Sequence, residues 1–317
     1  MTYRHIGNVM LTGRSTSGTS TTSAVTAALR ARVTAASTDS VPLFIGTDQE
    51  GGNVQVLRGS GYSTMPTALT QGTWDSSTLQ SSARTWGQQL HGSGINVNLA
   101  PVMDTVPSAA YAPYNKPIGY YHREFGYSTA QVADKGSAFL RGMSQAGVET
   151  SVKHFPGLGL VTANTDTTVG VRDTKMTLNG SFSSYVNPFL AGVNAGAGMV
   201  MMSSAIYSNI DAHAPACFSY KIITQVLRGQ HGYNGIVISD DLGNAKAVSP
   251  WAPGTRAVWF LLSGGTMILT VNANVVTEMY NAVLARARSD ASFRRIVQAS
   301  CNRVLLRKAA RGLIGGC

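Results

Sequence analysis

Seven short apolar runs recur along the chain, and longer amphipathic segments lie between and after them. Their β-branched and aliphatic residues predict strands over Ile6–Thr12, Pro42–Asp48, Ile95–Pro101, Glu149–His154, Gly198–Ser203, Gly235–Asp240 and Thr266–Val271. The other segments predict helices over Ser20–Ala36, Ser76–Leu90, Ala130–Ala146, Ser184–Ala195, Tyr220–Gln230, Val275–Arg288 and Ala291–Ala310. Apolar strands that alternate with helices are typical of a parallel sheet covered on both faces, so the predicted class is α/β.

Polar residues follow these runs at the points where the predicted strands end. They are Asp48-Gln49-Glu50 after the second run, Asp104 just past the third, Lys153-His154 on the fourth and Asp240-Asp241 on the sixth. A parallel barrel collects such residues at the carboxyl ends of all its strands, whereas an open doubly wound sheet concentrates them at one switch point. The pattern therefore favours a (β/α)8-type (TIM) barrel, of which seven strands are recognisable.

The composition agrees with one globular domain. The chain has 317 residues, of which 44% are hydrophobic, which suffices for a single large core. Barrels of this type need about 250 residues, so we expect one catalytic barrel domain over residues 1–317. The 25 Lys and Arg outnumber the 15 Asp and Glu, giving a net charge of +10. Because the basic residues form no runs and do not alternate with aromatic residues, they indicate a basic surface, and no nucleic-acid partner is expected.

The cysteines and the apolar segments bear on cross-links and location. Cys217, Cys301 and Cys317 give neither a disulfide framework nor the spacing of a metal cluster. Cys301 falls on the apolar stripe of the last predicted helix, so we expect it in the core, and a Cys217–Cys301 bridge is the open alternative. The longest apolar region, Ala257–Val271, is interrupted by a serine and two glycines and is too short to span a bilayer. No stretch resembles a signal peptide, so we expect a soluble protein, either cytoplasmic or secreted with its leader removed.

The sixth apolar run delivers two carboxylates at its end. Asp240, at the mouth of a barrel, is well placed to act as a nucleophile or to stabilise an oxocarbenium-like transition state. Asp241 precedes Leu-Gly-Asn, so the alternative interpretation is the N-cap of a helix. The two interpretations are compatible if Asp241 caps and Asp240 reacts.

Two other strand ends carry groups suited to a polar ligand. Lys153 and His154 are followed by the chain-turning pair Pro156-Gly157, and a bulge or turn there would aim both side chains into a cleft, where they suit vicinal hydroxyls. The alternative is a core histidine beside a lysine that reaches solvent. The run from Asp48 to Gly52 is not a phosphate loop, because no Gly-Lys-Ser/Thr follows. No spacing of His, Cys and Asp resembles a metal site, so neither a metal nor a cofactor is expected.

Five ordered blocks of this sequence resemble glycoside hydrolase family 3, in particular its compact single-domain β-N-acetylhexosaminidases. The blocks are Asp48-Gln-Glu-Gly-Gly, Asn98-Leu-Ala-Pro-Val-Met-Asp104, Ile118-Gly119 with Arg123-Glu-Phe-Gly126, Lys153-His-Phe-Pro-Gly157, and Ile238-Ser-Asp240-Asp241. The resemblance implies a barrel and a retaining mechanism that passes through a covalent glycosyl-Asp240 intermediate. It also implies sugar-hydroxyl contacts by Asp48, Arg123, Lys153 and His154.

The sequence departs from this family in the loop that follows Lys153-His154. The family usually has His-Gly and then Asp-Ser-His there, and that Asp–His pair supplies the general acid/base. Here Leu158-Gly159 and Asn164-Thr165-Asp166 stand in those places. Asp166 is therefore the candidate acid/base, a role that carboxylic acids fill in most glycosidases. Aspartic acid ordinarily ionises at lower pH than histidine, so we expect an acidic activity optimum. Asn53 also stands where the family tends to have an arginine after Glu-Gly-Gly, so the binding contact of that arginine is not expected here.

A second departure lies at the amino terminus, where the family's first strand and helix should precede Ile6–Thr12 and are absent. An open seven-stranded barrel would expose two strand edges.

The expected substrate is a carbohydrate with a terminal β-linked N-acetylglucosamine, from a chitin oligomer or a cell-wall fragment. The alternatives are a sugar-binding protein with impaired catalysis, a glycoside phosphorylase, and a β-glucosidase or β-xylosidase of the same fold.

Overall fold

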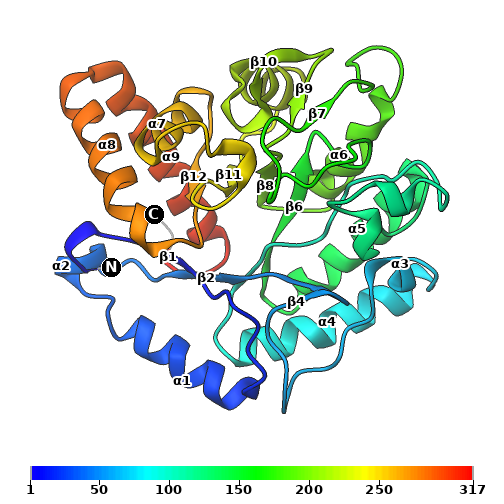
Figure 1. The fold of residues 1–317 in the computed structure, drawn as a ribbon. Helices are drawn as coiled ribbons and strands as arrows, with labels where there is room; N and C mark the ends of the chain where they lie inside the picture. Colours follow the sequence, from blue (N-terminus) through cyan, green and yellow to red (C-terminus); the bar gives the residue numbers. More distant parts are fainter. Residues whose placement is uncertain (1, 316–317) are drawn as a thin grey trace.

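The computed structural model describes residues 2–315 and is built around a curled sheet of seven parallel strands (Figure 1). In spatial order the strands are β1 (Asn8–Met10), β2 (Phe44–Thr47), β5 (Val97–Asn98), β6 (Glu149–Phe155), β8 (Met199–Met202), β11 (Ile236–Asp241) and β12 (Met267–Leu269). Each lies within or overlaps one of the seven runs expected from the sequence. The α/β class and the parallel sheet are therefore confirmed.

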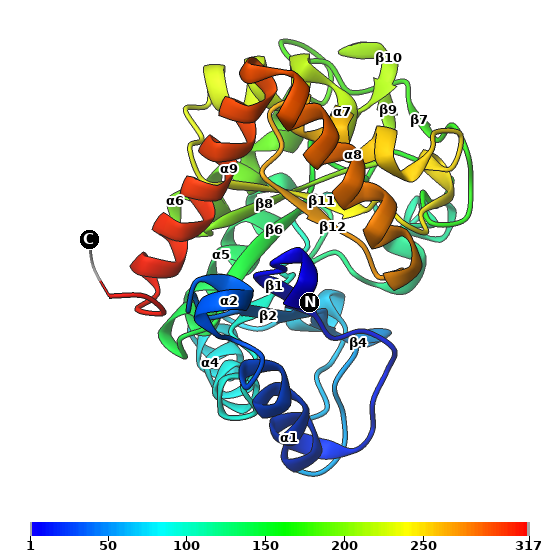
Figure 2. The same cartoon turned by 90° about the vertical axis from the view of Figure 1, so that its left-hand side faces the viewer.

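Helices cover the outer face of this sheet (Figures 1 and 2). They are α1 (Gly18–Arg30), α2 (Ala35–Thr38), α3 (Ala68–Gln71), α4 (Ser76–Gly92), α5 (Thr129–Gln145), α6 (Asn187–Asn194), α7 (Pro253–Leu262), α8 (Val276–Ser289), α9 (Ala291–Ala310) and a π-helix over Lys221–Gln230. The helix expected over Ser20–Ala36 is two helices, because Thr34 and Ser37 form a capping box that begins α2.

Two small antiparallel or mixed sheets were not expected from the sequence. β3 (Gln49–Gly51) and β4 (Val54–Gln55) form a hairpin directly after β2. A second sheet has the order β10 (Asp211–Pro215), β9 (Ile206–Tyr207), β7 (Arg172–Asp173). These strands are too short to show an apolar period. The hairpin matters for function because it places Glu50 beside the carboxyl ends of the main strands.

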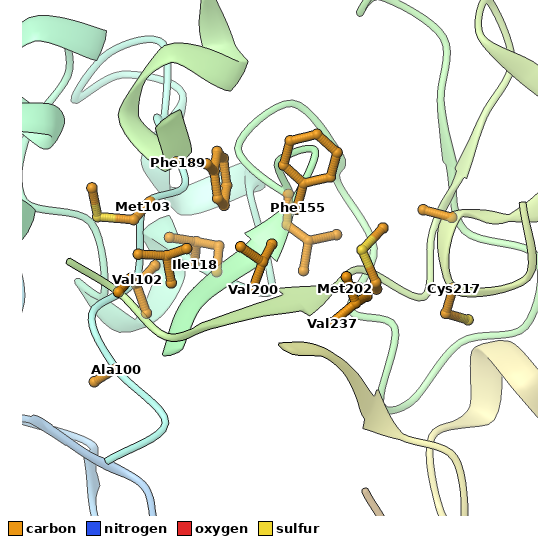
Figure 3. Close-up of a cluster of buried hydrophobic side chains, with 14 of the residues drawn as sticks. Ala100, Val102, Met103, Ile118, Phe155, Phe189, Val200, Met202, Cys217 and Val237 are labelled. Atoms are coloured by element: carbon orange, nitrogen blue, oxygen red, sulfur yellow. The ribbon is translucent and has the colours of Figure 1, made fainter. Parts of the chain in front are cut away.

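The core between the sheet and its helices fixes the strands that carry the candidate site. Phe155 at the end of β6 packs edge-on against Phe189 of α6, with ring centroids 5.6 Å apart (Figure 3). Val200, Met202 and Val237 of the neighbouring strands belong to the same buried cluster. The end of β6 and the first half of β11 are thus held by packing in this cluster.

The sheet does not close on itself within residues 2–315. β1 and β12 stand at its two ends, and a mainly apolar cavity of about 780 Å³ lies between them. Figure 2 views this side, with α8 and α9 above the first strands and α1 below. Lys308 of α9 donates hydrogen bonds to the carbonyls of Gly7 (2.9 Å) and Pro42 (2.7 Å), which ties the last helix to the segments leading into β1 and β2.

The cysteines differ from expectation in one respect. Cys217 is buried, Cys301 is exposed, and both are free thiols, so the alternative bridge between them is excluded. The expectation of a core position for Cys301 is wrong, because its stripe on α9 faces the open cavity between β12 and β1. Cys317 lies outside the described residues. None of the helices within residues 2–315 combines the length and apolar character needed to cross a membrane.

Candidate active site

The six residues singled out in the sequence all line one cavity of about 270 Å³: Asp48, Arg123, Lys153, His154, Asp166 and Asp240. Asp48 follows β2, while the other strand residues end β6 and β11, so the cavity lies at the carboxyl ends of the parallel strands. A site of this size is near the lower end of the range for small-molecule pockets. Apolar residues complete its wall: Met10, Val54, Leu158, Met201, Leu269 and Val271.

Lys153 and His154 both face this cavity although they are neighbours in β6. The register between β6 and β8 shifts between Val152 and Phe155, so the strand is irregular where the two residues lie. This is the arrangement expected for a ligand-binding strand end. The alternative of a core histidine beside a solvent-reaching lysine is wrong.

One wall of the cavity is a network of four charged side chains. Arg123 makes a two-pronged contact with Glu50, with Nη2–Oε1 at 2.8 Å and Nε–Oε2 at 2.9 Å. Lys153 Nζ lies 2.5 Å from Glu50 Oε1 and 2.7 Å from Asp48 Oδ1. Burial alone would favour neutral Glu50, but Arg123 and Lys153 lower its pKa to about 2.

The exposures in this network separate an anchor from a ligand-binding group. The Glu50 side chain is 3% exposed, whereas that of Asp48 is 22% exposed. Glu50 therefore holds the two cations in place. Asp48 and Arg123, whose side chain is 16% exposed, present the polar edge that a ligand would meet, whereas Lys153 is as deeply buried as Glu50 and lies behind that edge.

His154 is oriented by a fully buried carboxylate. Asp104 Oδ2 lies 2.8 Å from His154 Nδ1, and Asp104 Oδ1 accepts from the backbone N–H groups of His154 (3.3 Å) and Leu158 (2.7 Å). A carboxylate at this position assigns the hydrogen to Nδ1 and leaves Nε2 as the nitrogen available to a ligand.

Asp240 is the penultimate residue of β11 and is partly buried. Burial is the main effect that raises its pKa, to about 6; His154 opposes this rise, and the neighbouring Asp166 adds to it. Its neighbour Asp241 has another role. Asp241 Oδ1 accepts from the N–H groups of Gly243 (2.8 Å) and Val271 (3.3 Å). The N-cap interpretation of Asp241 is wrong, because no helix begins at Leu242 and the side chain instead closes a turn against the end of β12.

Asp166 lies on the loop after β6 and lines the same cavity as Asp240. Its backbone N–H donates to Asn164 Oδ1 at 2.9 Å. The loop is also held by the segment after β11, because Lys246 N donates to Asp166 O (3.2 Å) and Ala247 N to Thr165 O (2.9 Å). The loop that carries Asp166 is thus bonded to the segment that follows the strand carrying Asp240.

Sequence reasoning named two residues of this site without giving them a role. Glu50 and Asp104 both stood in the quoted blocks and after strand ends, which was the available signal. Their partners, Arg123 and His154, are 73 and 50 residues away along the chain.

Comparison with known proteins places the chain in a family. Residues 1–306 match the sequence model of the glycosyl hydrolase family 3 N terminal domain. A solved β-N-acetylhexosaminidase from Beutenbergia cavernae superposes with a TM-score of 0.94 and 50% identity, over 98% of this chain and 90% of that one. A β-hexosaminidase of Stenotrophomonas maltophilia is 34% identical over 260 residues, which is 79% of this chain and 73% of that protein.

A more distant solved structure agrees with the fold. The family 3 β-N-acetylglucosaminidase from Paenibacillus sp. has a TM-score of 0.87 and 26% identity, over 100% of this chain and 59% of that one. The curled sheet, the cavity at its carboxyl edge and these similarities lead to one conclusion. The chain belongs to glycosyl hydrolase family 3 and is a glycosidase.

Proposed function

We propose that the chain is a retaining β-N-acetylhexosaminidase that releases terminal β-linked N-acetylglucosamine, with Asp240 as nucleophile and Asp166 as general acid/base. The observation that carries this proposal is that both carboxylates line one small cavity and lie close enough for Asp166 to raise the pKa of Asp240. Two carboxylates at one sugar-sized site are the equipment of most glycosidases. The substrate class is taken from the similarity to the β-N-acetylhexosaminidases.

The proposed reaction has two steps. In the first, Asp240 attacks the anomeric carbon and the glycosidic C–O bond breaks, while Asp166 gives its proton to the departing oxygen. In the second, water gives a proton to Asp166 and its oxygen displaces Asp240 from the anomeric carbon. Both carboxyl groups then return to their starting states, and the configuration at carbon 1 is retained.

The charged wall orients the sugar in this proposal. Asp48 accepts hydrogen bonds from hydroxyls, Arg123 and Lys153 donate to them, and His154 Nε2 contacts a further hydroxyl. The natural substrate is then a chitin oligomer or a cell-wall fragment that enters by its non-reducing end.

We further propose that residues 1–317 form a single catalytic domain whose sheet is the larger part of a (β/α)8-type barrel. The place of the remaining strand is between β12 and β1. In support, neither strand has a second strand neighbour within residues 2–315, and an apolar cavity separates them. Hydrogen exchange tests this, because edge amides in β1 and β12 should exchange faster than those in β6. Equal protection would mean that the edges are covered.

The test of function is a panel of nitrophenyl glycosides across pH, run on the wild type, Asp240→Ala and Asp166→Asn. Release from β-N-acetylglucosaminide, with no turnover by Asp240→Ala, supports the proposal. Preference for β-glucoside or β-xyloside would reassign the substrate. Sugar phosphate formed only with added phosphate would identify a phosphorylase, and binding without turnover of any glycoside would identify a sugar-binding protein.

A further inference from the structure

The loop that carries Asp166 is fixed at several points, and one buried side chain makes the largest number of these contacts. Asn115 lies between the helical turns Ala112–Tyr114 and Gly119–Tyr121 and is fully buried. Its Nδ2 donates to the carbonyls of Leu158 and Val161, at 2.7 Å in both cases. The loop after β6 is therefore pinned at two carbonyls by one amide.

The other end of the Asn115 side chain holds the segment that leads to Arg123. Asn115 Oδ1 accepts from the N–H groups of Ile118 (3.1 Å) and Gly119 (2.8 Å). Arg123 is tied to the same segment, because its Nη1 donates to the carbonyl of Pro117, the residue before Ile118, at 2.8 Å. All donors and acceptors of the amide are used, and both hydrogens go to the loop that bears the acid.

A second side chain also binds this loop. The hydroxyl of Tyr111 donates to the Leu160 carbonyl at 2.7 Å, between the two carbonyls that Asn115 binds. Three carbonyls within residues 158–161 are thus bound by side chains from one neighbouring segment. Asp166 follows a few residues later and is joined to the segment after β11 by the bond from Lys246 N.

We propose that Asn115 is a positioning residue that places Asp166 relative to the glycosidic oxygen and links this placement to the loop that carries Arg123. The inference rests on the proposed role of Asp166. Neither the atoms of Asn115 nor those of Tyr111 line the cavity, so their effect is exerted through the loop. Asp104 and Tyr207 also hold this loop, at Leu158 N (2.7 Å) and Gly157 O (2.8 Å), and Asn115 adds the two hydrogen bonds that lie between these points and Asp166.

The test compares leaving groups. Asn115→Asp keeps the shape and the acceptor for Ile118 and Gly119, but it replaces Nδ2, which donates to two carbonyls, by one carboxylate oxygen that repels the carbonyls of Leu158 and Val161. We expect kcat/KM for N,N′-diacetylchitobiose, which needs an acid, to fall at least about tenfold more than kcat/KM for the 2,4-dinitrophenyl glycoside, which does not. Azide should accelerate turnover of the dinitrophenyl substrate by displacing Asp240 and forming the glycosyl azide.

Two further variants control for stability. Asn96→Asp makes the same change at an asparagine that also holds backbone, bonded to Ile45 N and the Leu43 carbonyl near the start of β2. It should show neither the leaving-group split nor azide acceleration. Tyr111→Phe removes one hydrogen bond without adding charge, and we expect the split in the same direction at roughly threefold.

The outcomes are distinguishable from failure of the proposed function. The leaving-group split is the larger fall in kcat/KM for diacetylchitobiose than for the dinitrophenyl glycoside. If Asp166→Asn shows this split but Asn115→Asp and Tyr111→Phe lower kcat/KM equally for both substrates, or not at all, the positioning role is wrong. If Asp166→Asn itself shows no split, Asp166 is not the acid and the proposed function fails in that respect. A split in both Asp166→Asn and Asn115→Asp, absent in Asn96→Asp, supports the inference.

Discussion

Asp104 Oδ2 lies 2.8 Å from His154 Nδ1, and the Asp104 carboxylate is fully buried. The same carboxylate also accepts from the backbone N–H groups of His154 and Leu158, so its position does not depend on the imidazole ring. The ring is therefore held in one orientation and one tautomer, with Nε2 available to the cavity.

Replacement of Asp104 by asparagine tests this orientation. The amide keeps the shape but removes the charged acceptor, so the ring can turn or change tautomer. We expect kcat/KM to fall by about tenfold to hundredfold, from the loss of one charge-assisted hydrogen bond. Steady-state kinetics on the nitrophenyl substrate measure it. A rate equal to the wild type would show that the orientation of His154 does not matter for catalysis.

The nucleophile is tested by Asp240→Ala. Removal of the attacking carboxylate should lower kcat by about 10⁴-fold or more, because no covalent intermediate can form. Circular dichroism and thermal melting serve as the control, and both should show a folded protein. Turnover comparable with the wild type would refute the assignment of Asp240.

The pair of carboxylates predicts different pH profiles for good and poor leaving groups. Attack requires ionised Asp240, whose pKa is raised to about 6 by burial, with a further contribution from Asp166. Two interacting carboxyl groups titrate as a pair, and when the pair loses its last proton no acid remains to protonate the departing oxygen. For chitobiose, kcat/KM should therefore be highest below about pH 6 and decline above it. For the dinitrophenyl glycoside, kcat/KM should rise through pH 6 to a plateau. Superimposable pH profiles for the two substrates would contradict the assignment of Asp240 and Asp166 as an interacting pair.

Glu50 contributes stability through its two cations. Because the pKa of Glu50 is lowered to about 2, this contribution is present above the unfolded-state pKa and is lost as the pH falls towards 2. Glu50→Gln leaves Arg123 and Lys153 without a buried counter-charge and should cost about 3 kcal/mol. Chemical denaturation at pH 7 measures the loss, and an unchanged midpoint would show that Asp48 alone satisfies both cations.

Ionisation of Glu124 should destabilise the protein, in contrast to ionisation of Glu50. It is buried, neither carboxyl oxygen has a hydrogen-bond partner among the described residues, and burial raises its pKa to about 7. When folding raises the pKa of a carboxyl group, the folded protein loses stability as the pH rises from the unfolded-state pKa through the raised value. Glu124→Gln should therefore melt at a higher temperature than the wild type at pH 8 and show no such gain at pH 4. The same gain at both pH values would mean that ionisation of Glu124 is not the cause.

The strands and the location of the site could be predicted because they depend on local patterns. Each apolar run became a strand, and residues at the strand ends, such as Asp48 and Asp240, meet because parallel strands share one carboxyl edge. The family resemblance added Arg123 and Asp166, which no strand end supplies.

The remaining features depend on partners that are distant in sequence. The turn at Asp241 is fixed by Val271, which no local pattern near Asp241 reveals. The exposure of Cys301 depends on the missing contact between β12 and β1. The role of Asn115 depends on a loop more than 40 residues later, with separations of 43 and 46 residues. Periodicity carries no information on such pairings.

Because the cavity is small, the effective concentration of a polymeric substrate is the concentration of its chain ends. A site that admits one terminal ring at a time responds to the number of chain termini and is indifferent to the mass of polysaccharide behind them. For the proposed chitin substrate, an insoluble particle would thus offer few chain ends however much polysaccharide is present. Its digestion would accelerate as soon as another enzyme cuts the interior of the chains and multiplies their ends.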